Sequence, residues 1–200
     1  IRDIPAIETL VQMMRERTGK PISHSNLSRD LEKDPKTIKR WLMILENLFV
    51  LFRVTPYSKK IARSILKEPR YYFFDIGVVA AIQERRYRRG TPEYGEAMET
   101  YVMHELKSYT DYVSGEPLAY WRSKSGFEVD YILGDHTAIE LKASENVAAN
   151  DLKSLKALAE EGKLKRYLCV SLEARRRQVG EVTILPVREF LDNLWDGAYS

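Results

Sequence analysis

Apolar residues recur every three or four positions along the first fifty residues, which predicts helices. The range 5–17 follows this spacing, and the turn residues 18–21 end the predicted helix. A shorter helix is expected to start after Ser23 or Ser25 and to bury Leu27 and Leu31. Two helices therefore precede the clearest local signal in this half of the chain.

That signal is Asp34-Pro35, because aspartate caps a helix well and proline suits its first position. The helix that begins here has one apolar face, made of Ile38, Leu42, Leu45 and Leu48. Extended patterns follow at 49–54 and 71–74, on either side of a basic interval. Three helices followed by two strands around a basic loop predict a winged helix-turn-helix.

The second half alternates between helical and extended patterns. Helical spacing covers 94–111, 147–161 and 188–195, and strand patterns cover 127–133, 137–144, 167–171 and 183–187. Gly134-Asp135-His136 joins the first two strands as a hairpin. The predicted fold class is α/β (α+β), with a mixed sheet flanked by helices behind the winged helix.

The hairpin separates apolar from charged side chains, because successive residues of a strand point to opposite faces. The apolar face is predicted to hold Val129, Tyr131, Leu133, Ile139 and Leu141, and the other face Glu128, Asp130, Glu140 and Lys142. Symmetric pairing around the turn sets Asp130 opposite Glu140 and Glu128 opposite Lys142, whereas a bulge would shift the register by one. Like charges directly opposite are destabilising, so a shared Mg²⁺ or Mn²⁺ is expected between Asp130 and Glu140.

Glu99 lies at the edge of the apolar stripe of the helix 94–111. An unpaired carboxylate is costly there unless a cation meets it. The helix alone favours a simpler interpretation, in which Glu99 reaches water from the flank of the helix.

Composition limits the class of protein. The 200 residues are 44% hydrophobic and 30% charged, which excludes a disordered or fibrous chain. The single cysteine, Cys169, excludes an internal disulfide, and the lack of a Cys/His cluster excludes structural zinc. No apolar run is long enough to span a membrane, so a cytoplasmic protein is expected. Because the chain starts with Ile1 rather than Met, it is expected to begin inside a longer polypeptide.

Charge divides the chain into two predicted domains, 1–90 and 91–200. The first carries 19 Lys and Arg against 10 Asp and Glu, and the second carries 13 against 19. A basic half is expected to approach a polyanion. The residues predicted to contact DNA are Lys36, Thr37, Lys39 and Arg40 on the third helix and Lys59, Lys60 and Arg63 in the wing. The alternative is a packing module whose basic face is merely solvated.

Asp130, nine intervening residues and then Glu140-Leu141-Lys142 resemble the D…ExK signature of the PD-(D/E)XK nuclease superfamily. Glu99 resembles the helix acid of many of its members. The chain as a whole resembles the C-terminal region found behind the ATPase module of many archaeal and bacterial AAA-type proteins. The matching stretches include 72–77, 95–106, 126–130 and 139–144. The resemblance thus implies a nuclease-like domain behind the winged helix.

This resemblance implies roles for four residues. Asp130 and Glu140 would bind Mg²⁺ or Mn²⁺, with Glu99 assisting, and Lys142 would position the attacking water or support the developing charge. The expected partners are DNA and an upstream ATPase module of the same polypeptide, without a membrane. ATP would bind only that module, since no GxxxxGK[ST] loop occurs here.

Two other functions compete with metal-dependent cleavage of DNA. One is a noncatalytic module that binds DNA or protein and regulates the ATPase. The other is a transcriptional regulator with a small-molecule sensor domain, which the second half supports less because it shows no apolar pocket signature. The sequence leaves the oligomeric state open.

Overall fold

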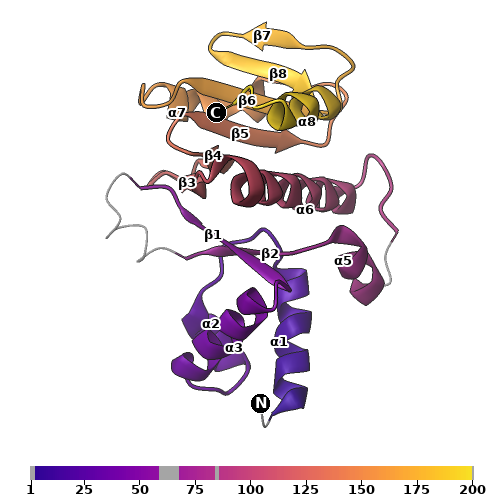
Figure 1. The fold of residues 1–200 in the computed structure, drawn as a ribbon, viewed down its shortest axis with the longest axis vertical. Helices are drawn as coiled ribbons and strands as arrows, with labels where there is room; N and C mark the ends of the chain where they lie inside the picture. Colours follow the sequence, from indigo (N-terminus) through magenta and orange to yellow (C-terminus); the bar gives the residue numbers. More distant parts are fainter. Residues whose placement is uncertain (1–2, 59–67, 84–85, 200) are drawn as a thin grey trace.

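The computed structural model describes residues 3–58, 68–83 and 86–199. The molecule is elongated, with a helical region at the end that holds the N-terminus and a stack of strands extending away from it (Figure 1). Lys59, Lys60 and Arg63, three of the residues predicted to contact DNA, lie outside the described residues.

The helical region follows the apolar spacing of the sequence. It comprises α1 (Ile4–Glu16), α2 (His24–Asp30) and α3 (Pro35–Asn47). The Asp34 carboxylate accepts hydrogen bonds from the amides of Lys36 and Thr37, so the predicted cap of α3 is confirmed. A separate hydrophobic core joins these helices to the strands and helix that follow; among its members are Leu10, Leu27, Ile38, Leu42, Tyr71 and Phe73.

Two antiparallel strands, β1 (Leu51–Pro56) and β2 (Arg70–Phe73), follow the three helices. The segment between them lies mostly outside the described residues, so the wing itself stays a prediction. The far end of β1 also pairs in parallel with β3 (Leu118–Arg122), through Thr55 and Pro56. This ribbon is therefore part of the sheet of the second half. The short helix α5 (Ile76–Gln83), which the sequence analysis did not predict, comes next.

Among the described residues, one mixed sheet of eight strands has the order β2-β1-β3-β4-β5-β6-β8-β7. Its remaining strands are β4 (Glu128–Leu133), β5 (Thr137–Lys142), β6 (Arg166–Ser171), β7 (Arg177–Val179) and β8 (Val182–Pro186). The antiparallel hairpin β4–β5 is confirmed, and β5, β6 and β8 run parallel. The mixed α/β class is thus confirmed, whereas the nuclease-like fold stays a proposal.

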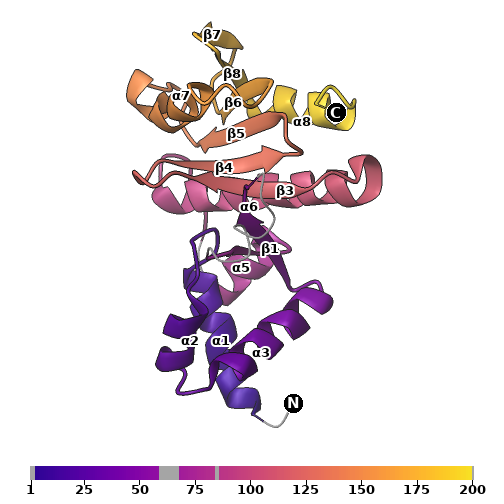
Figure 2. The same cartoon turned by 90° about the vertical axis from the view of Figure 1, so that its left-hand side faces the viewer.

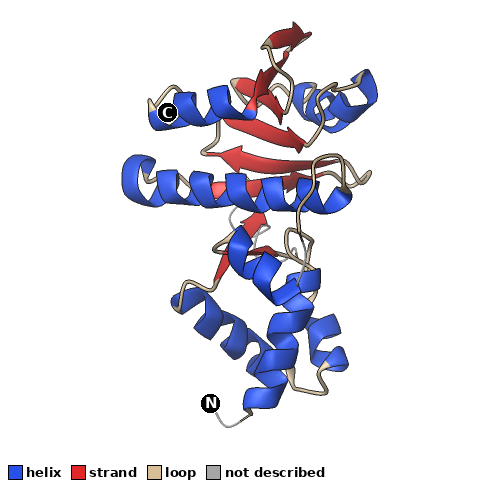
Figure 3. Ribbon diagram, turned by 90° about the vertical axis from the view of Figure 1, so that its right-hand side faces the viewer, coloured by secondary structure: helices blue, strands red, loops and turns tan. Residues whose placement is uncertain are grey.

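Helices cover both faces of this sheet. On one face lie α6 (Pro92–Tyr109), which continues into a π-helical turn at Thr110–Ser114, and α8 (Val187–Trp195). On the other lie the 3-10 turn Ala149–Leu152 and α7 (Lys153–Ala159). Figure 2 shows α7 and α8 on opposite sides of the strands, and Figure 3 shows α6 lying across them. Each face has its own buried hydrophobic cluster.

Three predicted side-chain positions in the helical region were wrong. Leu48 is 64% exposed because α3 ends at Asn47, one residue before it. Phe49 is 70% exposed and has a φ of 58°, so it forms a turn, and the strand begins only at Leu51. Leu31 is half-buried, because it is the C-cap residue that follows α2.

A bulge in β4 changes the predicted faces of the hairpin. Along β3, Ala119 pairs with Ile132 and Trp121 with Val129, so β4 has one extra residue between these pairs. Val129 therefore packs in the cluster beneath α7, while Tyr131 packs in the cluster beneath α6. The prediction that both share one apolar face was wrong, and the extra residue falls beside Asp130.

Candidate functional site

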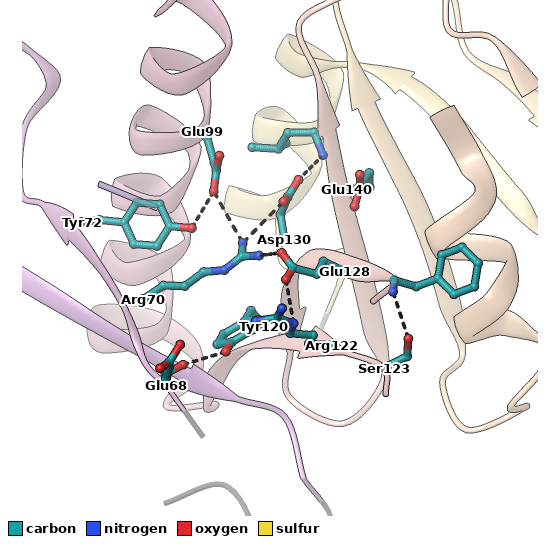
Figure 4. A network of polar contacts seen from close by, with 12 residues as sticks. Glu68, Arg70, Tyr72, Glu99, Tyr120, Arg122, Ser123, Glu128, Asp130 and Glu140 are labelled. Atoms are coloured by element: carbon teal, nitrogen blue, oxygen red, sulfur yellow. Dashed lines mark hydrogen bonds and ion pairs between the residues drawn. The ribbon is translucent and has the colours of Figure 1, made fainter. Parts of the chain in front are cut away.

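Three carboxylates converge on one buried arginine. Arg70, the first residue of β2, is 4% exposed. Its Nη1 atom lies 3.8 Å from Oε1 of Glu99 and 3.7 Å from Oδ1 of Asp130, and its Nη2 atom lies 2.5 Å from Oε2 of Glu128 (Figure 4). We call Glu99, Glu128 and Asp130 the acidic centre.

Aromatic packing and charge both hold the guanidinium in place. It lies 4.5 Å from the ring centre of Tyr120, whose hydroxyl donates to the backbone carbonyl of Glu68. Burial alone would lower the pKa of Arg70, but Tyr72 and the three carboxylates together raise it above its ordinary value. Arg70 therefore stays a cation inside the protein. Its Nε atom has no hydrogen-bond partner among the described residues.

Glu99 faces the centre from α6. The Tyr72 hydroxyl donates to its Oε1 atom over 2.6 Å, and the Tyr131 hydroxyl donates to its backbone carbonyl over 3.1 Å. Burial, followed by the charge of Asp130, raises the pKa of Glu99 to about 8. The interpretation of Glu99 as a carboxylate at the helix flank that simply reaches water was therefore wrong.

Asp130 connects the acidic centre to β5. Its Oδ2 atom accepts a hydrogen bond of 2.9 Å from the Leu141 amide, and its Oδ1 atom faces Arg70. Burial raises the pKa of Asp130, although the Leu141 amide and Arg70 act in the opposite direction. Tyr131 and Ile139 are the pair of β4 and β5 that lies farthest from the turn. Asp130 and Glu140 are the next residue on each strand, one position farther from the turn.

Glu140 and Lys142 form a second group on β5. The Lys142 ammonium donates to Oε1 of Glu140 over 2.7 Å, while the buried Oε2 of Glu140 has no partner among the described residues. Burial and then the charge of Asp130 raise the pKa of Glu140 to about 8. Burial lowers the pKa of Lys142, but the charge of Glu140, its hydrogen bond and the charge of Asp130 together raise the pKa above its ordinary value.

The structure brings the predicted catalytic residues into one neighbourhood but pairs them differently. Glu128 contacts Arg70 and Arg122, so its predicted pairing with Lys142 was wrong. The like charges of Asp130 and Glu140 do influence each other, as the predicted register requires. Protein cations offset them: Arg70 faces Asp130, and Lys142 binds Glu140.

The predicted metal ligands fit a divalent cation poorly. Within residues 3–58, 68–83 and 86–199, no three acidic, histidine or cysteine side chains form a group that could hold a metal ion. A guanidinium stands between Glu99 and Asp130, and an ammonium binds Glu140. Protein cations thus occupy the places beside the carboxylates where a metal ion was expected.

The sequence analysis missed the central residue of the site. Arg70 is the last residue of the basic interval between the two predicted strands, and the sequence analysis gave it no role in the acidic site. The available signal was its position directly before Tyr71-Tyr72-Phe73, which are all buried. A strand buried on both faces leaves no path to water for its first side chain.

The cations predicted on α3 have the opposite environment. Lys36, Lys39 and Arg40 are exposed, and none forms an ion pair with another described residue. Their spacing places them together at the beginning of the helix, opposite the buried face of Ile38 and Leu42. Thr37 differs, because its hydroxyl donates to Oδ2 of Asp34 within the cap.

Comparison with known proteins divides the chain near the same place as its charge. Residues 1–89 match the family model "Domain of unknown function (DUF8612)", and residues 94–190 match "Domain of unknown function (DUF4143)". The second domain is found in AAA-ATPase-associated proteins. Arg70 thus lies in the first matched region, and the acidic centre lies in the second.

Two mycobacterial relatives match a shorter part of the chain. They are the uncharacterized protein Rv2008c of Mycobacterium tuberculosis and the uncharacterized protein Mb2031c of Mycobacterium bovis. Each is 26% identical over 121 residues, which are 59% of this chain and 27% of the relative. The matched part thus spans about a quarter of the relatives. None of the helices in the described ranges has the length and apolar character needed to cross a bilayer.

Proposed function

We propose that this chain is a noncatalytic DNA-binding module that regulates an AAA-type ATPase, with α3 as the contact to DNA. The observation that supports it is that Lys36, Lys39 and Arg40, at the start of α3, are exposed and form no ion pair with the other residues that the structure describes. Other cations of the helical region, such as Arg17 and Lys33, are paired with Asp30 and Asp3. Exposed cations on one face of a helix can contact the phosphates of a DNA backbone.

The acidic centre has a structural role in this proposal. Its carboxyl groups face Arg70, so they are directed toward another part of the chain rather than toward a ligand in solution. The association of the second domain with AAA-ATPases supports an ATPase as the regulated partner. DNA would then bind at the end of the molecule that holds α1, α2 and α3 (Figure 1).

The salt dependence of DNA binding tests this proposal. Binding to a short duplex should weaken with salt, with a log–log slope of about −0.9 for each phosphate neutralised. The double variant Lys39→Ala/Arg40→Ala should flatten this slope by up to about two units. Lys153→Ala/Lys156→Ala removes two exposed lysines from α7 and should leave the slope unchanged. Equal slopes for all three proteins would contradict the proposal.

Hydrolysis of phosphodiesters is the second candidate function. It is favoured by the buried Oε2 atom of Glu140, which has no partner among the described residues and lies beside Lys142. Incubation of labelled duplex DNA with the chain, with Mg²⁺ or Mn²⁺ present, tests it directly. Cleavage that Lys142→Ala abolishes would support catalysis, and an intact duplex would leave the noncatalytic module as the function.

A further inference from the structure

The three carboxylates of the acidic centre surround a cation, and that cation is the Arg70 side chain of the same chain. Glu99 comes from α6, and Glu128 and Asp130 come from β4. All three place a carboxylate oxygen within 4 Å of the Arg70 guanidinium. Carboxylate oxygens are also the ligands that Mg²⁺ and Mn²⁺ prefer. The same three groups could therefore serve either kind of cation.

The backbone on both sides of Arg70 fixes the position of its side chain. Gly19 donates its amide to the carbonyl of Tyr71, and Ile22 donates to that of Pro69. Pro21 forms an isolated bridge with Arg70 itself. A tethered cation held this way has a high effective concentration at the centre, so a free ion competes with it poorly.

We propose that Arg70 and a divalent cation are alternative occupants of one position in the acidic centre. The guanidinium excludes the metal from the natural chain, and loss of the guanidinium converts Glu99, Glu128 and Asp130 into a metal site. The guanidinium already lies within 4 Å of a carboxylate oxygen of each of the three residues, so it occupies the position that a metal ion would need. This inference is independent of DNA binding by α3.

Mn²⁺ binding by the whole chain and by Arg70→Ala tests the proposal. Calorimetry should detect binding only to Arg70→Ala, and thermal unfolding should show the same difference. At a hundredfold excess over its dissociation constant, Mn²⁺ should raise the melting temperature of this variant by about 5–10 °C. The natural chain should not respond.

Two further variants separate a metal site from a general effect of charge. Arg122→Ala removes a different arginine that also contacts Glu128, 3.0 Å away, and it should not respond to Mn²⁺. Arg70→Ala/Asp130→Asn removes one proposed ligand and should lose the response that Arg70→Ala gains. A response of equal size in Arg122→Ala or in the natural chain would overturn the proposal.

The test also covers a variant that does not fold. If Arg70→Ala is unfolded without metal, circular dichroism should show that millimolar Mn²⁺ restores its helices and strands. Failure of Mn²⁺ to bind the folded variant, or to refold the unfolded one, would overturn the proposal. Loss of DNA binding by α3 variants would leave this result unaffected, so the two proposals fail separately.

Discussion

The cations of α3 and the arginine of β2 belong to the same N-terminal region but have opposite surroundings. Lys36, Lys39 and Arg40 face solvent without ion pairs among the described residues, whereas Arg70 is buried among three carboxylates. An exposed charged side chain keeps its hydration, so it costs little free energy and needs no partner within the protein. A buried charge requires its partners within the fold. Identical formal charges are therefore exposed to solvent in one place and paired within the fold in the other.

Removing Arg70 should have the largest effect on stability. Arg70→Ala leaves the partly buried carboxylates of the acidic centre without their cation, which should cost at most about 3–5 kcal/mol of unfolding free energy, the range for breaking a fully buried ion pair. Chemical denaturation in metal-free buffer measures this loss. Arg122→Ala is the control, because the Arg122 side chain is 46% exposed and should cost less than about 1 kcal/mol. Similar losses in both variants would remove the distinction between buried and exposed cations.

Glu99→Gln should change how stability depends on pH. The pKa of Glu99 is about 8 in the folded chain, against its ordinary value of 4.5. Between these values the folded chain binds a proton that the unfolded chain has released, so the unfolding free energy falls as the pH rises. One such group contributes at most about 1.4 kcal/mol per pH unit, and less here, because the Glu99 side chain keeps 24% of its surface exposed.

Denaturation curves between pH 5 and 8 measure this slope, since these limits lie within the window that the two pKa values define. The variant should show a shallower fall than the natural chain and should gain most stability at the alkaline end. Glu96→Gln, on the same helix but with a side chain that is 42% exposed, should change the slope much less, because the charge of Glu96 makes only a small contribution to the raised pKa of Glu99. A slope that Glu99→Gln does not alter would show that Glu99 is ionised throughout this range.

Gly19→Ala tests how closely the helical region approaches the acidic centre. Gly19 has a φ of 72°, and a Cβ atom added there would lie 3.0 Å from Oε1 of Glu99 and 3.1 Å from Cε1 of Tyr72. The backbone conformation alone costs about 1–2 kcal/mol for alanine, and this crowding should add roughly another 1 kcal/mol. Gly126→Ala has a φ of 90° but no neighbour within 4 Å, so it measures the backbone cost alone. Equal losses would mean that Glu99 and Tyr72 move aside freely.

The sequence predicted those parts of the fold that depend on local patterns. Asp34-Pro35 marked the start of α3, and Gly134-Asp135-His136 marked the turn between β4 and β5. Both signals act over a few residues, so they do not depend on the rest of the chain. The bulge beside Asp130 was not predictable in this way, because it follows from the pairing of β4 with β3, a strand that the sequence analysis missed.

The candidate site was predicted only in part, for a similar reason. Asp130, Glu140 and Lys142 lie on neighbouring strands of one hairpin, so their spacing indicated that they would be close. Arg70 reaches the same place from a strand 60 positions before Asp130, through the parallel pairing of β1 with β3. No local pattern encodes that contact. The sequence therefore indicated a cation near Asp130 but not that an arginine would supply it.

Removing cations from α3 should have the smallest effect on stability. Lys39 and Arg40 are exposed and form no ion pair with another described residue, so Lys39→Ala/Arg40→Ala breaks no ion pair within the described fold. Surface changes of this kind usually shift the unfolding free energy by no more than about 0.5 kcal/mol. Denaturation without DNA should therefore give nearly the same midpoint for this variant and the natural chain. A loss comparable to that of Arg70→Ala would show that the basic face of α3 packs within the protein, which is the alternative to DNA binding.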